Sequence, residues 1–207
     1  FMHNDAERRG GGLEAWNGAV LVSTQFIGNT AEEGGGLSLY GSNTTMVNAV
    51  IADNQVSLHG SGLYITGSPV RSFHTTIARN TGGDGSGVYA DAASNVAMTN
   101  TLLVSQTVGI TATSDVIVVL NGVLWYSNTV NTGGAATINV TNDLTGTSAF
   151  ATDGYHLTLA SMAIDQGMNA GVTTDIDGEP RPMGAGFDLG ADEFRWFTIY
   201  LPLVVRQ

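Results

Sequence analysis

The chain consists of short segments in which apolar and polar positions alternate, separated by glycine, asparagine and serine. Alternation with a period of two is typical of β-strands, and no segment of ten residues has the 3.6-residue period of an amphipathic helix. The pattern predicts four pairs of short strands. The pairs are 13–16 with 19–22, 37–40 with 46–51, 63–65 with 70–77, and 88–90 with 96–98. A continuous apolar run at 116–120 predicts a further strand that is buried on both faces.

The strand pairs belong to a repeat of about 25 residues. Four asparagines recur at spacings of 25, 25 and 26 residues, namely Asn4, Asn29, Asn54 and Asn80. Four glycines recur at spacings of 24, 26 and 25 residues, namely Gly12, Gly36, Gly62 and Gly87. A fixed period in this range is typical of a solenoid that has one coil per repeat. We therefore predict an all-β fold, a right-handed parallel β-helix (β-solenoid) with about 25 residues per coil and a C-terminal cap or extension.

The recurring asparagines predict a structural ladder formed by Asn4, Asn29, Asn54, Asn80 and Asn128. Stacked amides can hydrogen-bond from coil to coil, and asparagine also tolerates the left-handed conformation that a sharp corner requires. Ser105 stands where the pattern expects another asparagine. The repeated glycines predict a second corner, and a ligand-binding role for the asparagines is the alternative interpretation.

The repeat pattern divides the chain into three regions. We expect coils of the β-helix at residues 1–149, a C-terminal end region at 150–196 and an apolar terminal strand at 197–207. A repeat is already under way at Phe1, from which we infer that upstream sequence was removed or that Phe1 marks a processed boundary.

The end region carries four spaced motifs, at Asp153–Leu157, Ser161–Gly167, Asp175–Pro182 and Asp188–Phe194. In this order they resemble the C-terminal end of secreted bacterial right-handed parallel β-helix proteins of the choice-of-anchor Q type. The resemblance covers residues 150–194, and the upstream asparagine and glycine repeats are similar to the coils of that family. It implies the β-helix fold and export from the cell, with a surface or adhesive role for many members, and it implies no particular activity.

Composition narrows the classes of function. The 207 residues carry 18 acidic and 7 basic side chains, a net charge of −11, and every basic residue is arginine. This balance excludes the basic surface that nucleic acid or anionic lipid requires. No run approaches the roughly 18 apolar residues of a transmembrane helix, so we expect no membrane span. The cysteine-free and lysine-free composition, rich in Thr, Asn and Gly, favours an extracellular or cell-surface protein.

We expect no cofactor, and calcium is the one candidate. The weak candidates for its ligands are Asp175, Asp177, Asp188 and Asp192. Asp175, Asp177 and Gly178 resemble the start of a calcium-binding loop, but Gly186 occupies the position where a complete EF-hand loop needs a glutamate. The alternative is that these aspartates form Asx-turns and an ion pair with Arg181.

We expect no catalytic residues. Hydrolases of polysaccharides need a pair of carboxylates, whereas the solenoid acids fall at different phases of the repeat, namely Asp53, Asp84, Asp91 and Asp115. A lyase-like site would need a basic residue, and Arg71, His74 and Arg79 fall within one coil. Polysaccharide cleavage at these three residues therefore stays an alternative.

Aromatic residues follow the first strand of successive coils at Trp16, Tyr40, Tyr64 and Tyr89. If the rings face outward, they could form a ladder that binds sugar. If they pack against one another, they stabilise the coils through offset stacking, which is the interpretation we favour.

The terminal segment suggests self-association. Its apolar residues are Phe197, Ile199, Tyr200, Leu201, Leu203, Val204 and Val205. The segment could pack over the open end of its own solenoid, or pair with a neighbouring chain by β-augmentation. Solenoids normally cap their open ends, and no cap is evident before the first repeat. We therefore expect a structural β-solenoid that forms homo-oligomers or filaments through an open N-terminal coil and this strand. A module that binds surface glycan and a polysaccharide-degrading enzyme are the alternatives.

Overall fold

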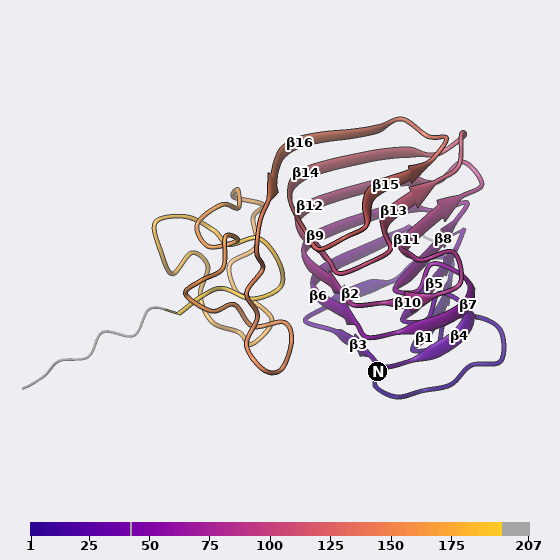
Figure 1. Ribbon diagram of the computed structural model, residues 1–207, viewed down its shortest axis with the longest axis horizontal. Coiled ribbons are helices and arrows are strands. Elements are labelled where there is room, and N and C mark those ends of the chain that lie inside the picture. The colour runs from indigo at the N-terminus through magenta and orange to yellow at the C-terminus, as the bar shows by residue number, and fades with distance from the viewer. Residues whose placement is uncertain (42, 196–207) are drawn as a thin grey trace, which may run out of the picture.

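The computed structural model describes residues 1–41 and 43–195, and it confirms the β-solenoid. About 5 turns of parallel strands stack on one another, roughly 25 residues apart (Figure 1). The prediction of an all-β solenoid is therefore correct. Within the described ranges, no helix is long and apolar enough to cross a membrane.

Successive coils contribute strands to three parallel sheets. The first sheet has six strands, in the order β1 (Leu13–Trp16), β5 (Leu37–Tyr40), β8 (Leu63–Thr66), β11 (Ser86–Asp91), β13 (Val108–Ala112) and β15 (Val130–Gly134). The second sheet contains β2 (Val20–Val22), β3 (Gln25–Ile27), β6 (Thr44–Ala52), β9 (Pro69–Ala78), β12 (Asn95–Val104), β14 (Ile117–Tyr126) and β16 (Ile138–Thr145). The third contains β4 (Thr30–Glu33), β7 (Gln55–His59) and β10 (Thr81–Gly82).

Inward-pointing side chains form the main core of the solenoid. In β5, Leu37 and Leu39 belong to this core and are fully buried, because alternate residues of a strand point to the same face. The coils stack in register, with Leu37 beside Leu63 and Leu63 beside Val88. Each inward position thus becomes a column of apolar side chains, and each such leucine or valine contributes about 1.5–3 kcal/mol through burial.

The apolar run at 116–120 lies mainly in β14. Val118 and Leu120 point into the core and are fully buried, whereas Ile117 and Val119 are 55% and 42% exposed. The prediction of a strand buried on both faces is therefore wrong, because the outer face of the second sheet meets solvent at this position.

The asparagine column lies at the corner that follows the second sheet. The Nδ2 groups of Asn4, Asn29 and Asn54 each donate to Oδ1 of the next asparagine in the column at 2.9 Å. The backbone amides of the same three residues also donate to these Oδ1 atoms, at 3.0, 2.9 and 3.0 Å. The column is buried at Asn29, Asn54 and Asn80, so the amide bonds are shielded from water.

Gln106, and not Ser105, continues this column. The amide of Asn80 donates to Oε1 of Gln106 at 3.1 Å, and the amide of Gln106 donates to Oδ1 of Asn128 at 2.9 Å. Left-handed backbone, with φ between 53° and 66°, occurs at the residue before each ladder position, at His3, Gly28, Asp53, Arg79, Ser105 and Ser127. The expectation that the asparagines themselves adopt this conformation is therefore wrong, and Ser105 occupies the left-handed position of its coil.

The glycine column marks a corner where the backbones of adjacent coils lie close together. A Cβ atom on Gly36 would lie 2.7 Å from the carbonyl oxygen of Gly62, and one on Gly62 would lie 2.8 Å from that of Gly87. A side chain at these positions would therefore force two coils apart. After β10 the third sheet ends, and the ladder spacing falls from 25 or 26 residues to 22 between Gln106 and Asn128.

Residues 146–195, which we call the flank module, contain turns and isolated bridges and no long strand. The module lies beside the second sheet and not over an end of the solenoid (Figure 1). A second apolar core joins the two parts and includes Val50, Ala78, Leu102 and Leu124 from the sheet and Leu157, Ala163, Ile176 and Leu189 from the module. The C-terminal region is thus an extension along the flank, which the sequence pattern did not place.

A second column of left-handed residues contributes polar contacts to this interface. Asn48, His74 and Asn100 have φ of 52°, 51° and 56° within the long strands of the second sheet. Nδ2 of Asn48 donates to the carbonyl of Thr174 at 2.8 Å. Asn100 donates from Nδ2 to the carbonyl of Met168 at 2.7 Å and accepts from the amide of Met168 at 3.0 Å. These paired bonds fix the position of the module on the sheet.

Candidate functional site

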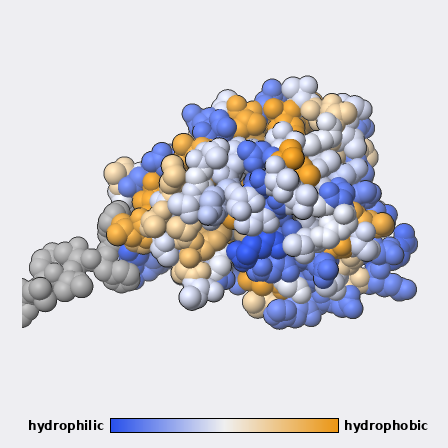
Figure 2. Space-filling model, viewed as in Figure 1, coloured by the Kyte–Doolittle hydropathy of each residue, from blue (hydrophilic) through white to orange (hydrophobic). Residues whose placement is uncertain are grey.

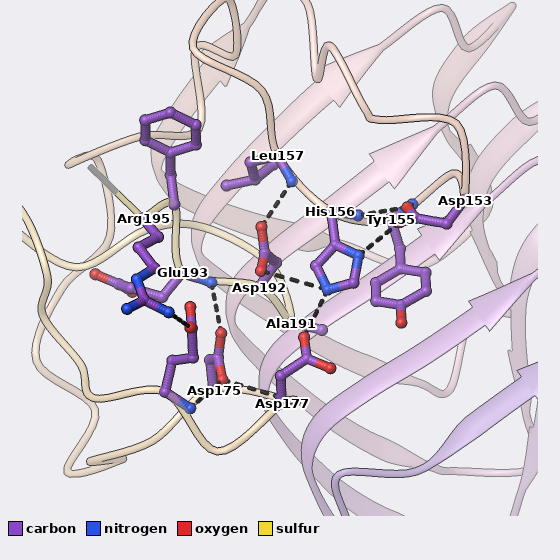
Figure 3. Close-up of polar contacts among 12 residues, drawn as sticks. Asp153, Tyr155, His156, Leu157, Asp175, Asp177, Ala191, Asp192, Glu193 and Arg195 are labelled. Carbon is purple, nitrogen blue, oxygen red and sulfur yellow. Dashed lines mark hydrogen bonds and ion pairs between the residues drawn. The ribbon is translucent and has the colours of Figure 1, made fainter. Parts of the chain in front are cut away.

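One histidine and three aspartates form a cluster in the flank module (Figure 3). Nδ1 of His156 lies 2.7 Å from Oδ2 of Asp153. Nε2 of His156 lies 2.6 Å from Oδ2 of Asp177 and 3.9 Å from Oδ1 of Asp192. The amides of Tyr155 and His156 both donate to Oδ1 of Asp153 at 3.1 Å, so a local turn orients the imidazole ring.

The carboxylates stabilise the protonated form of His156. Burial lowers the pKa of this residue, but hydrogen bonds with Asp153 and Asp177 and the charge of Asp192 outweigh burial and raise the pKa to about 9. Burial raises the pKa of Asp192 to about 6, although the amide of Leu157 donates to its Oδ2 at 2.6 Å and opposes the shift. At neutral pH one imidazolium therefore faces three carboxylates.

The structure separates the aspartates that the sequence suggested as calcium ligands. Asp177 and Asp192 lie beside His156, but Asp175 is buried and its oxygens accept hydrogen bonds from backbone amides. Oδ1 of Asp175 accepts from the amides of Asp177 and Glu179 at 2.9 and 2.8 Å, and Oδ2 accepts from the amide of Glu193 at 3.2 Å. The two bonds to Oδ1 close the turn at 175–179, as expected for an Asx-turn, and the bond to Oδ2 joins this turn to the loop at Glu193.

Asp188 also serves the backbone. It is 2% exposed and accepts hydrogen bonds from the amides of Asp165 at 2.7 Å and Phe194 at 2.6 Å. Asp175 and Asp188 therefore use their oxygens to hold loops of the module together. The four aspartates do not form one cage of oxygen ligands.

A buried ion pair lies beneath these loops. NH1 of Arg181 donates to Oε2 of Glu193 at 2.6 Å, and their side chains are 0% and 1% exposed. NH2 of Arg181 donates to the carbonyls of Gly190 and Ala191 at 3.0 and 2.7 Å. The alternative interpretation of the sequence paired Arg181 with an aspartate, and that partner is wrong, because the ion pair joins Arg181 to Glu193.

We expect titration of Asp188 to lower the free energy of unfolding as the pH rises from about 4 to about 7. Burial raises the pKa of Asp188 to about 7, against the opposing effect of the amides of Asp165 and Phe194. A carboxyl group with a raised folded-state pKa stabilises the fold fully below its unfolded value of about 3.9, and this contribution is lost as the pH rises through about 7. Urea unfolding over this range should show a decline that is smaller in Asp188→Asn, where Asp192, with a pKa raised to about 6, still contributes. Parallel pH profiles for the two proteins would contradict the assignment.

The predicted aromatic residues stack along the outer face of the first sheet. The ring centroids lie 4.7 Å apart for Trp16 and Tyr40, 5.8 Å for Tyr40 and Tyr64, and 5.8 Å for Tyr64 and Tyr89. Arg9 lies over the ring of Tyr40, 4.6 Å from its centroid. Tyr40 and Tyr64 are only 9% and 7% exposed, whereas Trp16 is 59% exposed. The arrangement favours stabilisation of the coils over a continuous sugar-binding platform.

The residues that suggested enzymatic chemistry have separate partners. Among the basic candidates, Arg71 is exposed, His74 is fully buried and Arg79 pairs with Asp53 at 2.7 Å. Burial lowers the pKa of His74 to about 3, so its ring is neutral. The remaining solenoid acids accept hydrogen bonds from different groups, Asp84 from Ser86, Asp91 from Tyr64 and Asp115 from Thr113. The structure does not bring these residues together.

The solenoid ends at β15 and β16, which lie at the edges of the first and second sheets. Within the described residues, each of these two strands has a neighbouring strand on one side only. Val130 of β15 is 48% exposed, and Ala136, Ile138 and Val140 pack on the main core while only partly buried. Apolar side chains lie among hydrophilic ones at this upper end of the molecule (Figure 2).

At the opposite end, β1 and β2 are the terminal strands of the same two sheets. Val20 and Val22 of β2 are 77% and 58% exposed. The self-association residues of the terminal segment, at positions 197–205, lie outside the described residues.

Sequence reasoning missed two features. The sequence pattern did not single out His156, although Asp153 three positions earlier is a signal for a local carboxylate–imidazole pair. It also overlooked Gln106 as a ladder residue, because the amide appears one position after the expected one. Comparison of the chain with protein-family models, with curated proteins and with solved structures finds no match.

Proposed function

We propose that this protein is an extracellular or cell-surface structural β-solenoid that self-associates end to end into homo-oligomers or filaments. The observation that carries the proposal is the coil end at β15 and β16, where strand edges and apolar side chains have no neighbouring strand among the described residues. An unpaired strand edge is a template for pairing with another chain. We assign this edge to the first coil of a second copy.

The hydrogen-bonding direction of the ladder supports a head-to-tail arrangement. Each asparagine donates to the residue of the following coil, as Asn54 does to Asn80. Among the described residues, Oδ1 of Asn4 therefore lacks a donor, and the backbone amide of Asn128 lacks an acceptor, while its Nδ2 donates to the carbonyl of Leu103. A head-to-tail contact joins this donor to this acceptor. Such contacts generate a filament when the rotation between copies does not close a ring.

Sequence features supply the rest of the proposal. The apolar positions in 197–205 provide a segment that can pair with a neighbouring chain by β-augmentation. The resemblance of residues 150–194 to exported β-helix proteins and the lysine-free composition support a location outside the cell. The proposal includes no catalytic residue and no cofactor.

Introducing a charge at the coil end tests the proposal. We expect the light-scattering mass of the wild-type chain to rise with concentration to at least twice that of the monomer. Val130→Lys should reduce this association at least tenfold, because a charged side chain at an edge opposes strand pairing. Ile117→Lys is the matched control, since Ile117 is similarly exposed at 55% but lies on the flank in β14. A wild-type chain that stays monomeric, or equal effects of the two variants, would reject the proposal.

Carbohydrate binding is the second candidate, and one observation favours it. Trp16 is 59% exposed while its ring stacks on Tyr40, which leaves part of an aromatic surface open to a sugar ring. A glycan array with the wild-type chain and Trp16→Ala distinguishes this role from self-association. No comparable observation favours polysaccharide cleavage, because the solenoid acids contact separate partners.

A further inference from the structure

We infer that His156, Asp177 and Asp192 form a binding site for a divalent transition-metal ion such as Zn²⁺. Nε2 of the histidine and one carboxylate oxygen of each aspartate all lie within 4.8 Å of one another. Tetrahedral bonds of about 2.0–2.2 Å separate ligand atoms by roughly 3.3–3.6 Å. The observed separations of 2.6 and 3.9 Å from Nε2 lie on either side of this value, so small side-chain movements complete the geometry.

The side chain of Asp192 offers one carboxylate oxygen to a cation. Its side chain is only 7% exposed, and Oδ2 accepts the amide of Leu157 at 2.6 Å. Oδ1 accepts no hydrogen bond from any described residue and faces Nε2 of His156 at 3.9 Å. Asp192 and His156 also line a groove, so a cation can reach this carboxylate. A metal ion between Oδ1 and Nε2 takes both atoms as ligands.

The orientation of His156 matches that of a metal-bound histidine. Nδ1 lies 2.7 Å from the carboxylate of Asp153, which leaves Nε2 directed at Asp177 and Asp192. Histidine ligands in metal sites usually donate the second ring N–H to a carboxylate in this way, which fixes the tautomer and the ring plane. Asp153 is therefore a positioning residue of the site and not a ligand.

The charges of the surroundings also favour a divalent ion. Three carboxylates face one imidazole, which leaves an excess of negative charge whether or not the ring is protonated. The arginines of this region form ion pairs with other acids, Arg181 with Glu193, Arg195 with Glu179 and Arg79 with Asp53. The excess charge is therefore available to a bound cation.

The ligand types select a transition metal over calcium. Calcium prefers six to eight oxygen ligands, whereas imidazole with carboxylates suits zinc and its first-row neighbours. The other nearby aspartates, Asp175 and Asp188, use their oxygens for backbone amides. A groove of about 200 Å³, lined in part by His156, Asp192 and Glu179, adjoins the cluster. It leaves room for water as the fourth ligand.

Metal titration of the full chain after dialysis against a chelator tests the site. We expect one equivalent of Zn²⁺ to bind, and Co²⁺ to give the intense visible absorption of a four-coordinate site. Asp177→Asn should weaken binding at least tenfold, and this variant should fold because the side chain is 44% exposed. Asp153→Asn should weaken binding by about 10–100-fold, the usual effect of losing the partner of a metal-bound histidine.

The matched control is His59→Gln, which removes another histidine–aspartate pair, with Asp84, outside the module. This variant should bind Zn²⁺ as the wild-type chain does. A wild-type chain that binds no Zn²⁺, binding that Asp177→Asn leaves unchanged, or displacement of Zn²⁺ by an equal concentration of Ca²⁺ would each overturn the inference.

Discussion

Replacement of Asn54 by alanine should lower the free energy of unfolding by about 3–5 kcal/mol, because it leaves several buried polar groups without partners at about 1–3 kcal/mol each. Oδ1 of Asn54 accepts both the amide and Nδ2 of Asn29 at 2.9 Å. Nδ2 of Asn54 donates to Oδ1 of Asn80 and to the carbonyl of Phe26, each at 2.9 Å. Asn54 is 0% exposed, so water has no direct access to replace these bonds.

The ladder contains its own control for this prediction. Asn4 donates to Asn29 in the same geometry, but it is exposed and lies at the end of the column. Water can solvate the groups that Asn4→Ala releases, so we expect a loss of less than about 1.5 kcal/mol. Urea unfolding of both variants checks the pair. Equal losses, or a loss below about 1 kcal/mol for Asn54→Ala, would show that the ladder does not stabilise the coils in this way.

Replacement of Arg181 by methionine should destabilise the flank module by about 3–5 kcal/mol, the usual effect of removing one partner of a buried ion pair. The change leaves the carboxylate of Glu193, whose side chain is 1% exposed, without its cation. It also removes the donors to the carbonyls of Gly190 and Ala191. Since these loops pack on the second sheet, hydrogen exchange should accelerate across residues 146–195 while the solenoid strands stay protected.

Two further variants separate the buried charge from a general effect of mutation. Arg195→Gln removes an ion pair with Glu179 whose side chains are 54% and 30% exposed, and it should change stability by less than about 1 kcal/mol. The double variant Arg181→Met with Glu193→Leu should recover part of the lost stability, because it removes the unpaired charge. If Arg181→Met and Arg195→Gln had the same small effect, the buried pair would not anchor the module.

The fold could be predicted because its signals are local and repeated. Alternating apolar side chains, corner glycines and a side-chain amide are all present within one coil. Each coil repeats these three features at a fixed period. The third sheet was not predicted because β4, β7 and β10 lie in the polar stretches that the pattern assigned to turns. Gln106 was not predicted as a ladder residue because it is a glutamine, whose longer side chain places its amide in the column where the pattern expects an asparagine.

No periodic sequence pattern indicated the structure of the flank module or the cluster of His156 with three aspartates. His156 and Asp177 are 21 residues apart, and Leu157 and Asp192 are 35 apart, in a segment of turns. Their meeting depends on how the module packs against Asn48 and Asn100 of the second sheet. The motifs of residues 150–194 indicated that this segment is organised, but spacing alone does not tell which aspartates share a site and which bind backbone amides.

Self-association through the coil end is the central claim of this account, and negative-stain microscopy of the wild-type chain tests it most directly. We predict rods of the width of one molecule whose length increases with protein concentration, and much shorter particles for Val130→Lys. Uniform particles of monomer size at every concentration, for the wild-type chain as for Val130→Lys, would contradict it.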